Sequence, residues 1–113
     1  MENDAILVFT RFGMGEAPLD LQQDLTVKFL SLLAHNESLP AKIIFYTDGV
    51  KLACQGSPAL EALIELEKCG VELILCQTCL NYYQLLDQVK VGIVGGMPDI
   101  IEAMHKANKV IHL

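Results

Sequence analysis

The segment GVELILCQTCL, residues 70–80, decides the fold, because it joins a helix end, a strand and the start of a second helix. Gly70 is a residue type that ends helices, and an apolar run from Val71 to Leu75 follows it directly. A short apolar run without polar alternation is typical of a strand that is buried on both faces. Two cysteines, Cys76 and Cys79, then stand where the strand gives way to a helical pattern.

Outward from this segment, the chain alternates between strand-like and helix-like patterns. Four more apolar runs predict strands over residues 5–9, 43–46, 91–94 and 110–113. Apolar residues at helical spacing lie between the runs, and they are Leu25, Phe29, Leu32, Leu33; Leu60, Leu63, Ile64; Tyr82, Leu85, Leu86, Val89; and Met97, Ile100, Ile101, Met104. Pro18 and the pair Ser57-Pro58 stand where the first two helices are expected to begin. The alternation predicts an α/β fold with three layers, α-β-α, around a five-stranded, mostly parallel sheet.

Composition sets the class of protein. The chain has 113 residues, which we interpret as a single domain spanning 1–113. Apolar residues make up 52% and charged residues 19%, which favours a well-covered core or a subunit interface. The apolar runs are far shorter than the roughly 20 residues of a membrane span. The acidic N-terminus argues against a signal peptide, so we expect a cytoplasmic protein with reduced cysteines. The net charge is −6 and the basic residues are scattered, which excludes a nucleic-acid surface.

Sites of parallel α/β folds form beyond the carboxyl ends of the strands. That rule selects the loops 10–18, 47–56 and 76–80. Gly13 and Gly15 in the first loop would let the backbone approach a ligand, or would make a tight turn. Because the phosphate-loop ending and the GxGxxG pattern are both missing, a turn into the first helix is the favoured interpretation. Thr47-Asp48-Gly49 is likewise interpreted as a turn that ends the second strand.

The CxxC pair at the strand-to-helix junction predicts a reactive thiol. Backbone N–H groups at the helix start, around Thr78, would lie near the Cys76 sulfur and favour its thiolate. A helix dipole contributes only about 0.3–1 kcal/mol, whereas one pKa unit corresponds to about 1.4 kcal/mol. A strongly nucleophilic Cys76 therefore needs a cation, and Arg11 and Lys51 are the candidates in loops of the same edge.

A pair of cysteines at this spacing can also bind a metal, form a disulfide or be inert. A structural zinc site needs four ligands, and Cys54 and Cys69 are not spaced as a second pair, so no metal and no cofactor is expected. A structural disulfide is disfavoured in a reducing compartment. Two inert, buried thiols remain an alternative, and we expect Cys54 and Cys69 to be of that kind. In the helix after the pair, we expect Tyr82 in the core and Tyr83 facing the site or a neighbour.

Four segments resemble the DsrE-like family of small sulfur-handling proteins: FGMGE (12–16), DGVKLACQGS (48–57), LEKCGVELILCQTCLNYYQLLDQVKVG (66–92) and ANKVIHL (107–113). The nearest likeness is to the C-terminal domain of YedF-type proteins, which are sulfurtransferase-like and linked to selenium metabolism. The resemblance implies that the cysteine ending the third strand carries a persulfide, which by position is Cys76. Cys79 then matches the second cysteine of members with a CxxC.

The resemblance also implies partners. Family members assemble as trimers or hexamers, so a homo-oligomer is expected here, whether dimer, trimer or hexamer. Sulfur donor and acceptor proteins are implied, including the TusA-like domain that precedes YedF-type domains. That domain is missing here, which we interpret as a standalone member or an excised domain. Gly95-Gly96 stand where similar sequences have an asparagine, so no polar role is expected there.

Two functions follow as hypotheses. The first is a persulfide carrier or sulfurtransferase-like protein, in which Cys76 takes a sulfur, Cys79 resolves it, and Arg11, Lys51 and the N–H groups near Thr78 stabilise the anion. Whether this amounts to an enzyme is open. The alternative is a non-catalytic module in which the glycine loops bind a small ligand and the thiols are incidental. A carrier thiol is expected to titrate below the pKa of free cysteine.

Overall fold

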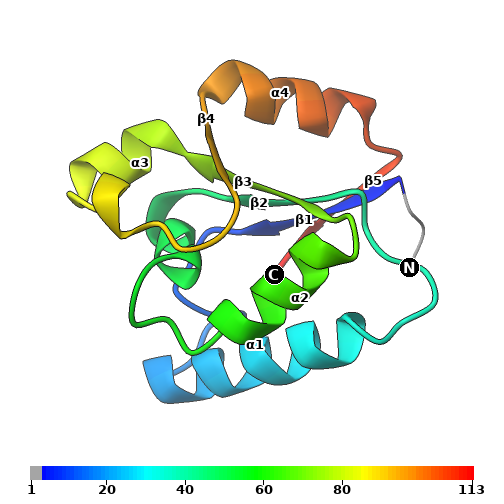
Figure 1. Ribbon diagram of the computed structural model, residues 1–113, viewed down its shortest axis with the longest axis horizontal. Helices are drawn as coiled ribbons and strands as arrows, with labels where there is room; N and C mark the ends of the chain where they lie inside the picture. The colour runs from blue at the N-terminus through cyan, green and yellow to red at the C-terminus, as the bar shows by residue number, and fades with distance from the viewer. Residues whose placement is uncertain (1–3) are drawn as a thin grey trace.

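The computed structural model describes residues 4–113, which form one five-stranded parallel sheet in the order β4-β3-β2-β1-β5 (Figure 1). The strands are β1 (Ala5–Phe9), β2 (Lys42–Phe45), β3 (Glu72–Cys76), β4 (Ile93–Gly95) and β5 (Lys109–His112). The helices are α1 (Leu19–Leu33), α2 (Leu60–Lys68), α3 (Gln77–Tyr82) and α4 (Met97–Lys106), with short 3-10 helices η1 (Thr47–Ala53) and η2 (Leu86–Gln88). The predicted α/β class and the parallel sheet are confirmed.

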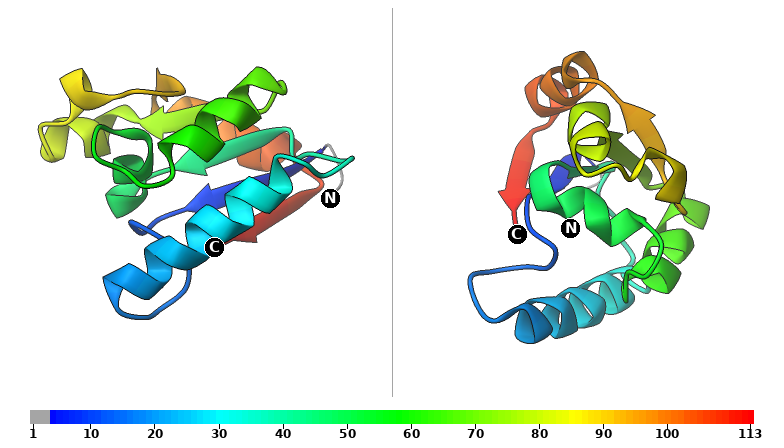
Figure 2. Two further views of the ribbon diagram at one scale, coloured as in Figure 1. Left: turned by 60° about the horizontal axis from the view of Figure 1, so that its bottom comes forward. Right: turned by 90° about the vertical axis from the view of Figure 1, so that its left-hand side faces the viewer.

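The helices lie in layers that the connection order explains. The chain builds the sheet outward from β1 to β4 and then returns across it to β5 on the far side of β1. Right-handed connections that run in opposite directions place their helices on opposite faces. Accordingly α1 and α2 cover one face and α4 covers the other (Figures 1 and 2). The short α3 lies instead beyond the carboxyl ends of the strands, against η1.

The core lies on both faces of the central strands. All five residues of β1 are buried, and the Phe9 and Phe45 rings stack at 5.7 Å between centroids. This confirms the expectation that continuous apolar runs mark strands buried on both faces. The expectation fails at β4, because it is an edge strand: Ile93 is 53% exposed and Val94 is 42% exposed.

The helix predicted over 82–89 is wrong. Helix α3 ends at Tyr82, whose side chain is 81% exposed rather than in the core. Gln84 takes a left-handed conformation with φ 58, and the Leu85 N–H bonds back to the Leu80 carbonyl at 2.8 Å. This is a Schellman-type helix ending, in which glycine usually holds the left-handed position. With glutamine there, the sequence carried no stop signal.

Smaller corrections concern helix faces and ends. Cys69 is exposed rather than buried, because it is the residue that caps the end of α2. Helix α2 begins at Leu60, later than predicted, and the Ser57 hydroxyl accepts a hydrogen bond from the Ala59 N–H instead of capping the helix. Several residues of the predicted apolar stripes face outward, namely Leu25, Leu32, Ile64, Leu86, Met97 and Ile101.

Among residues 4–113, no helix combines the length and the apolar character that crossing a membrane requires.

Candidate functional site: two thiols at the carboxyl edge

Cys76 is the last residue of β3 and pairs with Gly95 of β4. Its side chain is only 1% exposed, so its sulfur lies inside the molecule. Cys76 also holds the N-cap position of α3, but its side chain makes no capping hydrogen bond. The N–H groups around the exposed Thr78 therefore do not hold the Cys76 sulfur, although the sequence predicted that arrangement.

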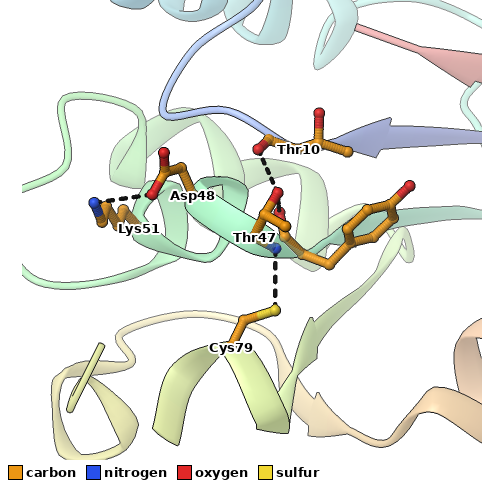
Figure 3. Close-up of polar contacts among 6 residues, drawn as sticks. Thr10, Thr47, Asp48, Lys51 and Cys79 are labelled. Carbon is orange, nitrogen blue, oxygen red and sulfur yellow. Dashed lines mark hydrogen bonds and ion pairs between the residues drawn. The ribbon is translucent and has the colours of Figure 1, made fainter. Parts of the chain in front are cut away.

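Cys79 lies in α3, and its side chain is partly exposed. Its Sγ accepts a hydrogen bond from the backbone N–H of Thr47, at 3.1 Å (Figure 3). Thr47 is the first residue of η1, so the bond joins α3 to the segment after β2. The backbone donor that meets a thiol at this edge thus comes from η1, which follows the neighbouring strand β2, and it reaches the second cysteine of the pair.

The conformation of Thr47 directs this N–H toward the sulfur. Thr47 has φ 49, a left-handed conformation that costs a non-glycine residue on the order of 1–3 kcal/mol. Its hydroxyl lies 2.5 Å from the carbonyl oxygen of Thr10 and 2.7 Å from that of Tyr46, and donates toward both. These contacts offset the strain and tie the start of η1 to the end of β1.

Gly49 allows η1 to sit this close to β1. A Cβ atom at position 49 would lie 2.1 Å from the carbonyl oxygen of Phe9, which no side chain tolerates. Glycine is thus required at position 49 because the backbone of η1 lies too close to the backbone of β1 for a side chain to fit between them. The sequence predicts only a turn at Thr47-Asp48-Gly49. The structure has a longer 3-10 helix there, Thr47–Ala53.

The pKa of the Cys79 thiol is raised above its ordinary value. Burial is the main cause, and the neighbouring Cys76 thiol raises this pKa further, while the Thr47 N–H lowers it. The balance leaves Cys79 protonated at neutral pH. Cys76 directly precedes α3 and Cys79 is the third residue of that helix, so the two thiols lie within one helical turn.

Lys51 and Tyr83 form a polar cluster beside the thiols, together with Asp48. The Lys51 ammonium lies 3.1 Å from the Asp48 carboxylate and 4.4 Å from the centre of the Tyr83 ring. The neighbouring Asp48 carboxylate raises the pKa of the Tyr83 hydroxyl to about 12, and the Tyr83 hydroxyl lowers the pKa of Asp48. Lys51 thus lies at the predicted edge, but a carboxylate already balances its charge.

Sequence reasoning missed Thr47 and Asp48 as residues of the site. The only signal was their place directly after the second strand, at the edge where sites form. Tyr83 was expected to face the site or a neighbour, and it does face this cluster.

The loop after β1 serves the start of α1. Arg11 forms an ion pair with Glu16 at 3.7 Å, and within residues 4–113 it does not pair with either cysteine. The Gln22 side chain donates to the Gly15 carbonyl at 2.7 Å, and a Cβ atom at Gly13 would collide with Gln22. The structure therefore places Gly13 and Gly15 in a turn into α1, which was the favoured interpretation.

The remaining cysteines stand apart from the site. All four cysteines are free thiols, and Cys54 is buried, donating to the Val50 carbonyl at 3.2 Å. No cluster of three or more His, Cys, Asp or Glu side chains among residues 4–113 is arranged to hold a metal ion. The chemistry of this edge is therefore that of two neighbouring thiols, one buried and one partly exposed.

Solved structures share the fold of this chain. YchN from E. coli is 16% identical over all of both chains, with a TM-score of 0.66. MTH1491 from Methanobacterium thermoautotrophicum is 18% identical over 96% of this chain and 98% of its own, with a TM-score of 0.66. BT1422 from Bacteroides thetaiotaomicron is 15% identical over 98% of this chain and 96% of its own, with a TM-score of 0.70. The last two are described as proteins of unknown function, and at these identities the likeness shows the fold alone.

Family assignment comes from the sequence. No curated protein matches the chain significantly. The profile of the DsrE/DsrF-like family, however, matches residues 10–113, which include both thiols and every element after β1. The chain therefore belongs to the DsrE/DsrF-like family.

Proposed function

We propose that this protein carries sulfane sulfur as a persulfide on the Cys76–Cys79 thiol pair. The observation behind the proposal is the pair itself: two free thiols within one helical turn at the carboxyl end of β3, with a backbone N–H on one sulfur. Membership of the DsrE/DsrF-like family supports it, since DsrE-like proteins handle sulfur. The finer likeness to YedF-type domains suggests selenium as a second cargo, because selenium undergoes the same exchange chemistry.

The chemistry is thiol exchange. A thiolate of the pair attacks the outer sulfur of a donor persulfide, a new S–S bond forms, and the donor's S–S bond breaks. The donor leaves as a thiol and takes up the proton that the attacking cysteine lost. Delivery to an acceptor thiol is the same step in reverse. Neither step changes the net oxidation state, so no further oxidant or reductant is needed.

A partner would have to activate the thiols. The pKa of Cys79 is raised, and the two nearby cations are engaged, Arg11 with Glu16 and Lys51 with Asp48. A cation from a donor protein, an acceptor protein, a TusA-like domain or a second copy of this chain would shift the pair toward the thiolate. Such a partner would complete the site, because the isolated chain keeps the Cys79 thiol protonated.

Persulfide labelling tests this function. The chain is incubated with a persulfide donor, alkylated and analysed by mass spectrometry for one added sulfur. The wild type is expected to gain sulfur within residues 76–79, and the double variant C76S/C79S, which keeps Cys54 and Cys69, is expected to gain none there. A wild type that no donor labels within this segment would contradict the carrier function.

The raised pKa of Cys79 favours a second candidate, a non-catalytic binding or assembly module. In that case the thiols are incidental, and the double variant C76S/C79S would support the same cellular sulfur or selenium phenotype as the wild type. Loss of that phenotype in the double variant, with unchanged thermal stability, would favour the carrier.

A further inference from the structure

We propose that Cys79, rather than Cys76, is the thiol that meets the sulfur donor, and that the Thr47 N–H positions its sulfur for the exchange. This inference rests on the proposed carrier function and assigns separate roles to the two thiols. It differs from the positional likeness to the family, which selects the cysteine at the strand end.

Access to the sulfur separates the two cysteines. Thiol exchange requires the attacking sulfur to approach the donor's S–S bond directly, so it depends on exposure. Cys76 is 1% exposed in the single chain, and association with another chain can only bury it further. Cys79 is partly exposed on the short helix α3. A donor therefore reaches Cys79 without any rearrangement of β3.

The contact with Thr47 gives Cys79 a second advantage. Its sulfur already accepts a backbone N–H at 3.1 Å, and a hydrogen bond to an ionised acceptor is about twice as strong as a neutral one. The bond therefore strengthens as the Cys79 thiolate or persulfide anion forms. The strained backbone of Thr47 is what directs the N–H, and such strain is often kept at functional positions.

The roles then follow in order. The Cys79 thiolate attacks the outer sulfur of the donor persulfide, and the donor leaves as a thiol with the proton of Cys79. Cys76 lies behind as the resolving thiol: it can attack the Cys79 sulfur, form a Cys76–Cys79 disulfide and release hydrogen sulfide. In that branch the two thiols are oxidised and the sulfane sulfur is reduced. An external low-molecular-weight thiol then reduces the disulfide.

Single-cysteine variants test which thiol meets the donor. The exposed Cys69 is first replaced in a C69S parent, so that it cannot take the label. With glutathione persulfide as the donor, C69S/C76S is expected to gain sulfur on Cys79 at least as fast as the parent does, whereas C69S/C79S is expected to lose most of the initial rate. In a second experiment, the C69S parent, which keeps both Cys76 and Cys79, reacts with less than one equivalent of donor. Peptide mass spectrometry then shows which of the two cysteines receives the first sulfur.

The outcomes are distinguishable. First labelling of Cys76 in the parent, or a full initial rate in C69S/C79S, would overturn the assignment to Cys79 and leave the carrier function standing. A parent that takes no sulfur at either cysteine would overturn the carrier function itself.

Removal of the Thr47 N–H tests the positioning role. An α-hydroxy acid at position 47 turns the amide into an ester and deletes this donor. We expect the alkylation pKa of Cys79 to rise by about one unit. Thr47→Ser keeps both the N–H and the hydroxyl that ties it to Thr10, so its Cys79 pKa should stay near that of the wild type. An unchanged pKa in the ester variant would overturn the positioning role, with thermal unfolding as the check on folding.

Discussion

At the scale of single residues, Thr47 joins the Cys79 thiol to the ends of β1 and β2. Its left-handed backbone places an N–H on the Cys79 sulfur, and its hydroxyl ties that backbone to the carbonyl of Thr10. Two influences on the pKa of the Cys79 thiol oppose each other. The hydrogen bond from Thr47 favours the thiolate, whereas burial favours the protonated thiol. Burial prevails, so Cys79 rests in the protonated state.

The first prediction concerns the pH dependence of Cys79. Since its pKa is raised, alkylation by iodoacetamide should reach half its maximal rate above the ordinary thiol pKa of about 8.5. Cys76→Ser should lower that midpoint, because the Cys76 thiol contributes to the upward shift. The rate at Cys79 is measured in a C69S background, with Cys69 of the wild type as the exposed control thiol. A midpoint below the ordinary value would contradict the structure.

Tyr83 offers a second prediction at the same scale. Its pKa is raised to about 12 by the neighbouring Asp48 carboxylate, so one tyrosine should ionise late in an ultraviolet absorbance titration. Asp48→Asn should bring that midpoint back toward the ordinary value of about 10, because the negative charge is gone. Tyr83→Phe should remove the late transition altogether. If the late transition persists in Tyr83→Phe, the assignment is wrong.

At the scale of elements, the sequence predicts those strands and junctions that a local pattern of apolar residues determines. Runs of buried apolar residues located all five strands within a few residues, and the junction of β3 with α3 located the two cysteines. What it missed depends on contacts between distant segments. The left-handed backbone of Thr47 is held by Thr10 at the end of another strand, and nothing in residues 47–49 encodes that contact. The end of α3 was missed because Gln84 occupies a position that glycine usually marks.

A third prediction tests the close packing of η1 on β1. Gly49→Ala should destabilise the protein by about 1–3 kcal/mol, because its Cβ would lie 2.1 Å from the Phe9 carbonyl oxygen. It should also weaken the Thr47–Cys79 contact and thereby raise the Cys79 pKa. Gly96→Ala is the matched control, since its nearest neighbour is 3.3 Å away and its φ is −95. Its effect should be smaller than that of Gly49→Ala, because a Cβ at 3.3 Å from Pro98 requires a shift of only a few tenths of an ångström. Chemical denaturation measures both, and equal effects would refute the packing argument.

At the scale of the whole molecule, the two edges of the sheet differ in character. The β5 edge exposes Lys109 and His112, whereas the β4 edge exposes Ile93 and Val94. Open strand edges invite pairing with another chain, and proteins that remain monomeric usually protect them with charge. The apolar content of the chain favours a well-covered core or a subunit interface. Two of its apolar residues, Ile93 and Val94, lie exposed on an edge strand that carries no charge. Since the thiols lie on β3 and α3, next to β4, a chain bound there would lie near them.

The last prediction is that this protein associates with itself through the β4 edge. Ile93→Lys puts a charge on that edge, where burial of a lysine against a second chain is unfavourable, so it should lower the molar mass measured by light scattering toward that of one chain. Leu32→Lys is the matched control: it makes the same change on α1, at a side chain that is 75% exposed against 53% for Ile93. It should leave the molar mass unchanged, because α1 offers no open backbone edge. A wild type with the mass of one chain, or equal loss of mass in both variants, would refute association through β4.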